Sequence, residues 1–200
     1  MYCVNRYFAI FKPMNMLSQF TREQGSTKQV LADLYDFPPD VYPVGRLDGD
    51  SEGLLLLSND KSLTDQLLNP RNKHSRTYLI QLEGEITSEA LMRLSKGVSI
   101  RIKKQDYITA PAVARITEEP GWLPERHPPV RYRSSISTTW ITLTLTEGKN
   151  RQVRRMTAAV GYPTLRLVRI AIGKMSVQIV LPDAVKLLSK EDLKLAIKDI

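Results

Sequence analysis

Three acidic residues beside a run of leucines form the segment best suited to acid–base or nucleophilic chemistry. Residues 45–60 are GRLDGDSEGLLLLSND, in which Asp48, Asp50 and Glu52 fall within five residues and precede four leucines. Leucine runs are usually buried, so at least one carboxylate should lie close to the core, where burial disfavours its charged form unless a cation offsets the cost. Because side chains alternate along a strand, Arg46 and Asp48 would share a face. An Asp-Gly pair is equally typical of a plain hairpin turn, and that alternative stays open.

A basic stretch at residues 149–174 is the second segment with chemical potential. It contains no Asp or Glu, and its seven basic residues are Lys149, Arg151, Arg154, Arg155, Arg166, Arg169 and Lys174. The remaining residues carry 22 basic against 21 acidic side chains, so this stretch holds nearly all of the net charge of +8. A concentrated positive field attracts phosphate, which makes a nucleic acid or another polyanion the expected partner.

The basic stretch begins with a predicted helix at 151–160, for which Asn150 is a suitable N-cap. Three arginines occupy its first turn and a half: Arg151, Arg154 and Arg155. Cations are unfavourable there because the helix dipole is already positive, and no neighbouring acid relieves them. We expect the compensation to come from a phosphate or a distant carboxylate, with Arg154 as the candidate partner of Asp48. Solvated surface arginines are the alternative.

The elements that position these residues are mostly strands. Strands are expected at 4–11, 41–47, 53–58, 76–83, 98–102, 107–116, 138–146, 164–172 and 175–180. Helices are expected at 27–35, 61–68, 87–95, 151–160 and 189–198. Because helices and strands do not alternate strictly, the pattern predicts an α+β fold with a mostly antiparallel mixed sheet and flanking helices. The proline-rich segment 120–135 is expected to be an extended loop that joins two subdomains.

Composition excludes several other classes of protein. One cysteine, Cys3, forms no internal disulfide, and one Cys with two His is too few for a structural zinc site. No apolar run approaches the ~18 residues of a membrane helix, and the first residues are a poor secretory signal. The expectation is a soluble cytoplasmic protein without a membrane partner.

Four segments, in this order along the chain, resemble the motifs of the pseudouridine synthases, in the branch that modifies ribosomal RNA. They are Lys12-Pro13, Gly45-Arg46-Leu47-Asp48 with residues 51–57, Arg76-Thr77-Tyr78, and residues 151–156 with 165–173. The resemblance covers about residues 5 to 180. Arg76 stands where lysine is more usual and Lys149 where arginine is, and both keep the charge.

The resemblance implies a single catalytic domain over residues 1–200, within which two subdomains flank a central cleft. The small RNA-binding domain that precedes many relatives is not expected, because the first strand begins near residue 4. The implied reaction isomerises a uridine of large-subunit ribosomal RNA, in its domain V, to pseudouridine. That reaction needs no cofactor and no metal, and a monomer is expected. The alternative is a non-catalytic RNA-binding or ribosome-assembly protein.

By the same resemblance, Asp48 is the essential carboxylate, and three roles stay open for it: attack on C1′, addition to C6, or removal of the C2′ proton. Tyr78 would pack against the uracil, Arg154 would keep Asp48 ionised, and Arg46 would fill the stack left by the flipped nucleotide. Supporting residues are Lys12, Pro13 and Leu165. The residues expected to hold the RNA backbone are Arg151, Arg155, Arg166, Arg126, Arg131 and Arg133. Aromatic side chains near the last three, expected either to stack on bases or to pack the loop, are Trp122, His127 and Tyr132.

Overall fold

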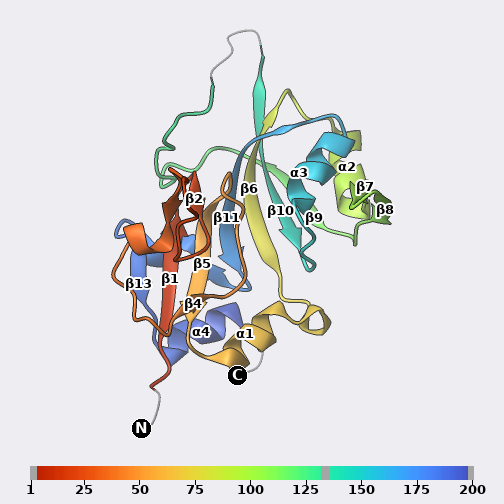
Figure 1. Ribbon diagram of the computed structural model, residues 1–200. Helices are drawn as coiled ribbons and strands as arrows, with labels where there is room; N and C mark the ends of the chain where they lie inside the picture. The colour runs from red at the N-terminus through yellow and green to blue at the C-terminus, as the bar shows by residue number, and fades with distance from the viewer. Residues whose placement is uncertain (1–3, 132–135, 198–200) are drawn as a thin grey trace. The chain divides into compact units, whose positions relative to one another are not determined.

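The computed structural model describes residues 4–131 and 136–197 (Figure 1). The chain forms two compact units. The first unit comprises the residues up to His74 and those from Arg169 onward, and the second comprises Ser75–Val168. The first unit is therefore built from both ends of the chain, and the second is inserted between them.

The first unit is a small antiparallel sheet with short helices around it. Its elements are β1 (Tyr7–Lys12), β2 (Met16–Leu17), β3 (Gln29–Val30), η1 (Leu31–Asp33), β4 (Tyr42–Pro43), β5 (Glu52–Ser58), α1 (Lys61–Leu68), η2 (Pro70–Asn72), β12 (Met175–Ser176), η3 (Val177–Val180), β13 (Val185–Leu187) and α4 (Lys190–Ala196). Strand β1 pairs antiparallel with β5 on one side and with β13 on the other. Strand β5 is buried along its whole length, which explains its run of four leucines.

Gly53 lets the backbone of β5 approach Arg169 closely. Its φ is +103°, and a Cβ at this position would lie 2.3 Å from the carbonyl oxygen of Arg169. The Arg169 Nε also donates to the Leu54 carbonyl oxygen at 2.7 Å. Only glycine suits both the backbone conformation and the contact distance here.

The second unit has a three-stranded antiparallel sheet covered by two helices and a hairpin. Its elements are β6 (Arg76–Glu83), α2 (Ser88–Lys96), β7 (Ser99–Ile102), β8 (Gln105–Ile108), β9 (Val113–Thr117), β10 (Thr138–Leu145) and α3 (Gln152–Ala159). Strand β10 lies between β6 and β9. Strand β11 (Thr164–Ile172) then carries the chain from the second unit back to the first.

One face of the β6–β10 pair forms the core of the second unit. Ile80 of β6 and Ile141 of β10 are opposite each other and fully buried. Leu94 of α2 and Met156 of α3 pack into the same cluster. Figure 1 shows α2 and α3 side by side over these strands, with the β7–β8 hairpin next to them. Helix α3, called the arginine helix because it carries Arg154 and Arg155 and begins after Arg151, is thus fixed by its apolar side to the sheet.

The predicted α+β class is confirmed, and most element positions agree. Within the described units the strand pairs are antiparallel, except for the short parallel pair of β2 with β3. The predictions for 61–68, 76–83 and 164–172 match α1, β6 and β11 residue for residue. Asp60 begins α1 by accepting from the backbone N–H groups of Ser62 and Leu63, which is the local signal of a helix start.

The predicted helix at 27–35 is wrong. Gln29 and Val30 pair with Met16 and Leu17, and only the 3₁₀ turn Leu31–Asp33 follows. The Asp33 carboxylate accepts from the Val30 N–H at 2.9 Å and from Arg22 at 2.7 Å. Tertiary pairing has therefore overridden a local helical pattern.

Three predicted strands are shorter than expected. Only Tyr42–Pro43 of 41–47 is a strand, and 175–180 is a strand for two residues before a 3₁₀ turn. The strand expected at 107–116 divides into β8 and β9. Pro111 lies in that gap and has no N–H to donate, while the Ala112 N–H bonds to Ser95 instead of to a strand.

Candidate active site

Asp48 stands on a turn that hydrogen bonds fasten before and after it. The buried Ser18 hydroxyl donates to the Leu47 carbonyl at 2.8 Å and accepts from the Leu47 N–H at 3.0 Å. The Asn15 N–H donates to the Gly49 carbonyl at 2.8 Å, and the Ser51 N–H donates to the Asp48 carbonyl at 3.0 Å. The backbone that carries the Asp48 carboxylate is therefore held in one conformation, with the side chain half-buried.

The first unit also contains buried charged residues, which interact electrostatically around Lys12. Lys12 is fully buried, and Glu52 and Arg169 are 2% and 5% exposed. Lys12 Nζ donates to the carbonyl oxygens of Pro13 at 2.9 Å and Met16 at 2.8 Å. The expectation that an acid of segment 45–60 lies in the core is confirmed by Glu52.

Electrostatic interactions connect Lys12 to three acids of the segment, Asp48, Asp50 and Glu52. Burial lowers the pKa of Lys12 to about 8, although the negative charges of Glu52, Asp50 and Asp48 act to raise it. The positive charge of Arg169 adds to the lowering. Lys12, which we predicted as a supporting residue, is thus part of the electrostatic surroundings of Asp48.

In the second unit, Tyr78 lies on β6 opposite Leu143 and packs, partly buried, against the core cluster. Arg154 is half-buried on α3, where its Nη1 donates to the Thr164 carbonyl at 3.3 Å. The core-facing side of α3 covers the same strand face on which Tyr78 lies. Asp48 belongs to the first unit, so its pairing with Arg154 and Tyr78 stays a prediction.

The start of the arginine helix differs from expectation. Arg151, not Asn150, is the N-cap, with a left-handed φ of 51° and no side-chain cap. The Asn150 side-chain oxygen instead accepts from Arg155 Nη2 at 3.1 Å, and its carbonyl accepts from Arg155 Nη1 at 2.8 Å. The predicted N-cap is therefore wrong, because Asn150 binds an arginine rather than the helix end. Arg151 remains exposed.

Glu147 organises the loop that leads into α3. Its carboxylate accepts from the Tyr107 hydroxyl, from the Ala110 N–H at 2.9 Å and from Gln152 Nε2 at 2.6 Å. Burial raises the pKa of Glu147, but these hydrogen bonds and the charge of Lys149 outweigh it, so the pKa lies below its usual value. The hydrogen bond to Glu147 raises the pKa of Tyr107. No local sequence pattern marks Glu147, because its partners lie up to 40 residues away.

Two arginines predicted to bind RNA instead contact protein oxygens. Arg166, 5% exposed, donates to the Pro124 carbonyl at 2.7 Å and lies 3.9 Å from the Glu119 carboxylate. Arg126 Nη1 donates to the Leu165 carbonyl at 3.1 Å. Both guanidinium groups therefore fasten the loop before β10 to β11. For Arg166, burial does not fit the predicted phosphate contact.

The remaining residues predicted to contact RNA differ in their exposure to solvent. Arg46 and Arg131 are exposed, and Trp122 is half-buried. Arg133 and Tyr132 lie outside the described residues.

Over residues 4–131 and 136–197, no group of three or more His, Cys, Asp or Glu side chains is placed to hold a metal ion. Within the same ranges, no helix combines the length and the apolar character that a membrane crossing requires.

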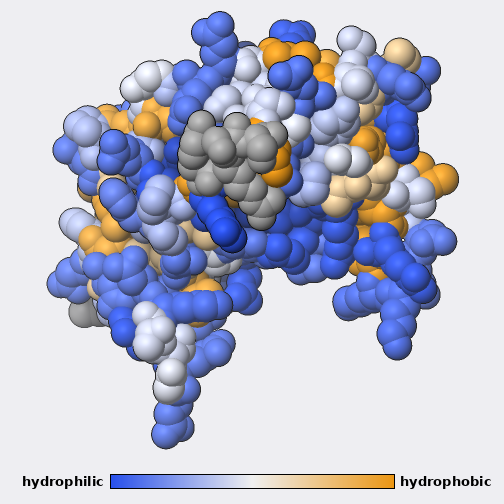
Figure 2. Space-filling view, turned by 90° about the horizontal axis from the view of Figure 1, so that it is seen from above, coloured by the Kyte–Doolittle hydropathy of each residue, from blue (hydrophilic) through white to orange (hydrophobic). Residues whose placement is uncertain are grey.

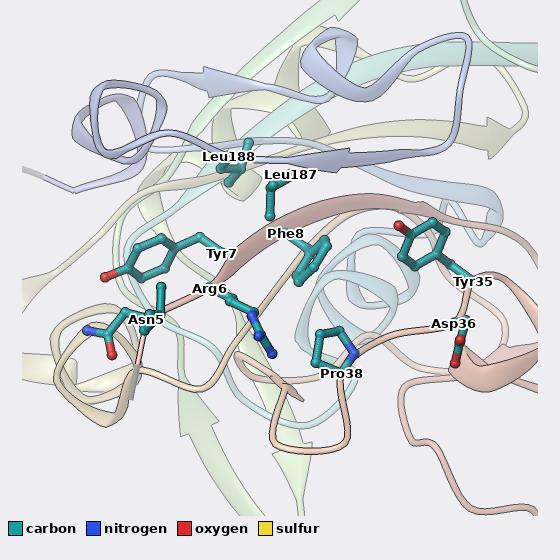
Figure 3. Close-up of a pocket in the computed structure, with 10 residues that line it drawn as sticks. Asn5, Arg6, Tyr7, Phe8, Tyr35, Asp36, Pro38, Leu187 and Leu188 are labelled. Carbon is teal, nitrogen blue, oxygen red and sulfur yellow. The ribbon is translucent and has the colours of Figure 1, made fainter. Parts of the chain in front are cut away.

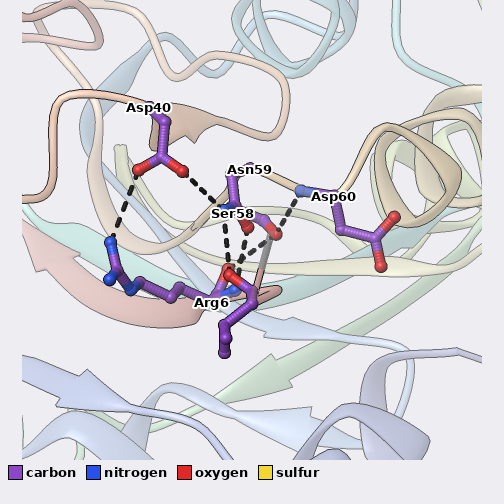
Figure 4. Close-up of polar contacts among 6 residues, drawn as sticks. Arg6, Asp40, Ser58, Asn59 and Asp60 are labelled. Carbon is purple, nitrogen blue, oxygen red and sulfur yellow. Dashed lines mark hydrogen bonds and ion pairs between the residues drawn. The ribbon is translucent and has the colours of Figure 1, made fainter. Parts of the chain in front are cut away.

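A cavity of about 430 Å³ lies at the start of β1. Its lining is mixed aromatic, aliphatic and polar (Figure 3): Val4, Asn5, Arg6, Tyr7, Phe8, Tyr35, Asp36, Pro38, Leu187 and Leu188. Contacts of Arg6 with Asp40, and of its backbone with Ser58 and Asn59, fasten this end of the strand (Figure 4). Lys12 stands at the other end of β1, about 17 Å away at the usual rise of a strand. The cavity is thus separate from the Asp48 turn.

The net charge is divided unevenly between the two units. The second unit has 15 basic and eight acidic residues, a net charge of +7, whereas the first has 14 and 13, a net charge of +1. The face shown in Figure 2 is largely hydrophilic, with hydrophobic residues in separate patches. The excess positive charge thus belongs to the unit that carries the arginine helix.

Comparison with known proteins identifies the family. The family model described as RNA pseudouridylate synthase matches residues 6–159, which is more than three quarters of the chain. The chain belongs to this family. It is therefore an enzyme, an isomerase that acts on RNA, as the four ordered motifs predicted.

Named relatives make the similarity more specific. Ribosomal large subunit pseudouridine synthase E of Xanthomonas axonopodis pv. citri is 49% identical over 162 residues, covering 81% of this chain and 83% of the relative. The protein of the same name from Vibrio vulnificus is 48% identical, covering 84% of this chain and 68% of the relative. Ribosomal large subunit pseudouridine synthase B of Bacillus subtilis is 34% identical, covering 82% and 59% respectively.

A solved structure supports the fold independently. A crystal structure of a pseudouridylate synthase matches with a TM-score of 0.76 at 23% identity, covering 97% of this chain and 74% of that chain. The predicted fold of the pseudouridine synthases is confirmed.

Proposed function

We propose that this chain converts one uridine of large-subunit ribosomal RNA, in domain V, to pseudouridine. Support comes from relatives named as large-subunit synthases at 48–49% identity, and from the net charge of +7 on the second unit. The reaction breaks the bond between ribose C1′ and uracil N1 and joins C1′ to uracil C5. The base loses the proton at C5 and gains one at N1, so the product is an isomer of the substrate.

Asp48 is the proposed catalytic carboxylate. The observation that carries this proposal is the fixed turn on which it stands, with Ser18 on one side and Asn15 on the other. A carboxylate held in position before the substrate arrives loses little freedom on reaction. Three steps are open to it: attack on C1′, addition to C6 of the base, or removal of the C2′ proton to give a glycal.

Other residues act on the same nucleotide. Tyr78 packs against the uracil and assists loss of the C5 proton, and Arg154 keeps the Asp48 carboxylate ionised. Arg46, two residues before Asp48, occupies the position in the base stack that the flipped uridine leaves, since the reacting bond is out of reach inside a helix. Lys12 and Pro13 support the site, and Leu165 belongs to the strand that follows α3.

The RNA backbone is held by arginines of the second unit. We assign this role to Arg151, Arg155, Arg131 and Arg133, the last as predicted from the sequence. Arg126 and Arg166 are assigned to the loop that they fasten rather than to phosphates.

Asp48→Asn and Asp50→Asn form a matched pair of variants to test this function. The two acids lie in the same turn, are both half-buried and lose the same charge. We expect Asp48→Asn to lower pseudouridine formation at least about 10³-fold while RNA affinity changes less than about threefold. Asp50→Asn should keep most of the activity. Full activity of Asp48→Asn would refute its role, and RNA binding without any modification by the unaltered chain would favour a non-catalytic protein.

The target uridine is found by mapping pseudouridines in ribosomal RNA from a strain that lacks this gene. Loss of one pseudouridine in domain V is expected. Comparing a transcript with the assembled ribosomal particle as substrate then shows which of the two the enzyme acts on.

A further inference from the structure

A second basic run, distinct from the arginine helix, lies in the second unit. Residues 90–105 contain no Asp or Glu, and their basic side chains are Arg93, Lys96, Arg101, Lys103 and Lys104. Three of these five belong to the β7–β8 hairpin. None of them figures in the four motifs.

The charged side chains of the hairpin are exposed, whereas Ile100 and Tyr107 face the core of the second unit. Ile100, 4% exposed, pairs with Tyr107, and both pack against the core cluster. Arg101 pairs with Asp106 on the opposite face, and both are exposed. Lys103 and Lys104 form the two-residue loop at the tip and are exposed as well.

The loop at the tip is an unfavourable place for two lysines. Their φ angles are 47° and 69°, the left-handed region that a two-residue hairpin loop of this kind requires at both positions. Asn-Gly is the usual solution, since residues with a long side chain pay a steric penalty there. Two adjacent like charges add repulsion. A local rule broken without local compensation points to a function for the residues concerned.

The hairpin is fastened to the beginning of the arginine helix. Glu147 accepts hydrogen bonds both from Tyr107 of β8 and from Gln152 of α3. Lys149 Nζ lies 4.9 Å from the centre of the Tyr107 ring. Helix α3 also packs against β7. The hairpin and the arginines at the beginning of α3 therefore belong to one compact unit and are joined by direct contacts.

We infer that Lys103 and Lys104 bind phosphates of the RNA substrate, so that the β7–β8 hairpin extends the RNA surface formed by Arg151 and Arg155. The inference rests on the proposed function for the identity of the RNA. It differs from that function in assigning a contact away from the reacting nucleotide. Phosphate groups suit this tip because they are multivalent anions, and a lysine binds them as a point charge without needing a fixed geometry.

The double variant Lys103→Asn/Lys104→Gly separates a binding role from a structural one. It installs the favoured loop sequence, so we expect the Tm to rise by about 2–4 °C. At the same time the affinity for large-subunit ribosomal RNA should fall about tenfold near 50 mM salt, and the slope of log K against log salt should decrease by about 2. If the lysines only shaped the loop, the variant would gain stability without losing affinity for RNA.

Charge reversal provides the second arm and its control. Lys103→Glu/Lys104→Glu should weaken binding further than the Asn-Gly variant. Lys190→Glu/Lys194→Glu makes the same charge change at two exposed positions of α4 in the first unit and should alter the affinity less than about twofold. Unchanged affinity and salt slope in both hairpin variants would overturn the inference.

RNA affinity is measured separately from pseudouridine formation, so the two proposals fail differently. Weaker binding of the hairpin variants, with no pseudouridine made by the unaltered chain, would sustain the hairpin contact and refute the proposed function. Normal binding by the hairpin variants, with pseudouridine made by the unaltered chain, would refute the hairpin contact and sustain the proposed function.

Discussion

The two units of this protein use charged residues in opposite ways. The first unit has almost balanced charge, and it buries Lys12, Glu52 and Arg169. The second unit has a net charge of +7 and leaves residues such as Arg151 at the surface. Buried charges fix geometry because each needs its partners, whereas exposed charges create a field that attracts a polyanion. On the proposed function, the first unit holds the catalytic carboxylate in place and the charge of the second attracts the RNA backbone.

The largest expected effect tests the rigidity of the first unit. Gly53→Ala would place a Cβ 2.3 Å from the backbone oxygen of Arg169 and force an unfavourable φ of +103°. We expect a loss of at least about 4 kcal/mol in the free energy of unfolding, measured by denaturant titration. Gly121→Ala is the control, because a Cβ there meets no described atom within 4 Å. Equal stability of the two variants would contradict the tight approach of β5 to Arg169.

The buried lysine makes stability depend on pH. The pKa of Lys12 is about 8 in the folded chain, against an ordinary value of 10.5, because burial disfavours its charge. Between these two pH values the unfolded chain binds more protons, so the free energy of unfolding rises with pH. Relative to Lys12→Met, the unaltered chain should gain up to about 1.4 kcal/mol per pH unit, about 3 kcal/mol in all.

The control for this pH dependence is an exposed lysine of the same unit. Lys190→Met should leave the difference in unfolding free energy constant across the same pH range, since Lys190 is exposed. A constant difference for Lys12→Met as well would show that Lys12 keeps an ordinary pKa.

Two buried serines distinguish positioning of Asp48 from general stability. The Ser18 hydroxyl hydrogen-bonds to both the N–H and the carbonyl of Leu47, next to Asp48. The Ser58 hydroxyl hydrogen-bonds to the Arg6 carbonyl and the Asp60 N–H, near the beginning of β1. Each change to alanine leaves a backbone group without its partner and should cost about 1–3 kcal/mol in unfolding free energy. Only Ser18→Ala should also lower kcat, by about 10–100-fold, with KM nearly unchanged. Equal kcat values for the two variants would argue against a role of Ser18 in catalysis.

The smallest expected effect concerns the charge of the second unit. Arg151→Gln removes one exposed cation and should reduce the slope of log K against log salt by about 0.9 for RNA binding. Lys190→Gln, which removes one exposed cation of the first unit, should leave the slope as it is. Similar slopes for the two variants would mean that both units contact RNA alike.

Local signals explain what the sequence predicts well. The ends of α1 and β6 follow from the cap at Asp60 and from alternating apolar residues, which act over a few positions. The motif of Asp48 is also local. The helix predicted at 27–35 fails because pairing with Met16 and Leu17, more than ten residues away, decides the conformation.

The supports of the site depend on contacts that no local pattern records. Ser18 reaches Leu47 across 29 positions, and Glu147 reaches Ala110 across 37. Arg169 stood out in the sequence only as one of several basic residues, yet it is buried against β5. The motif that contains Asp48 is therefore recognisable in the sequence, but the hydrogen bonds that hold its turn are not.

The proposed function assigns the chemistry to the Asp48 carboxylate and the contacts with the RNA backbone to basic residues of the second unit. Its most direct test is pseudouridine formation in a single turnover, with large-subunit ribosomal RNA fully bound by an excess of enzyme. Under these conditions Asp48→Asn should form no detectable pseudouridine, whereas Arg151→Gln and Asp50→Asn should reach nearly the rate of the unaltered chain. Product formation by Asp48→Asn at the unaltered rate would contradict the account.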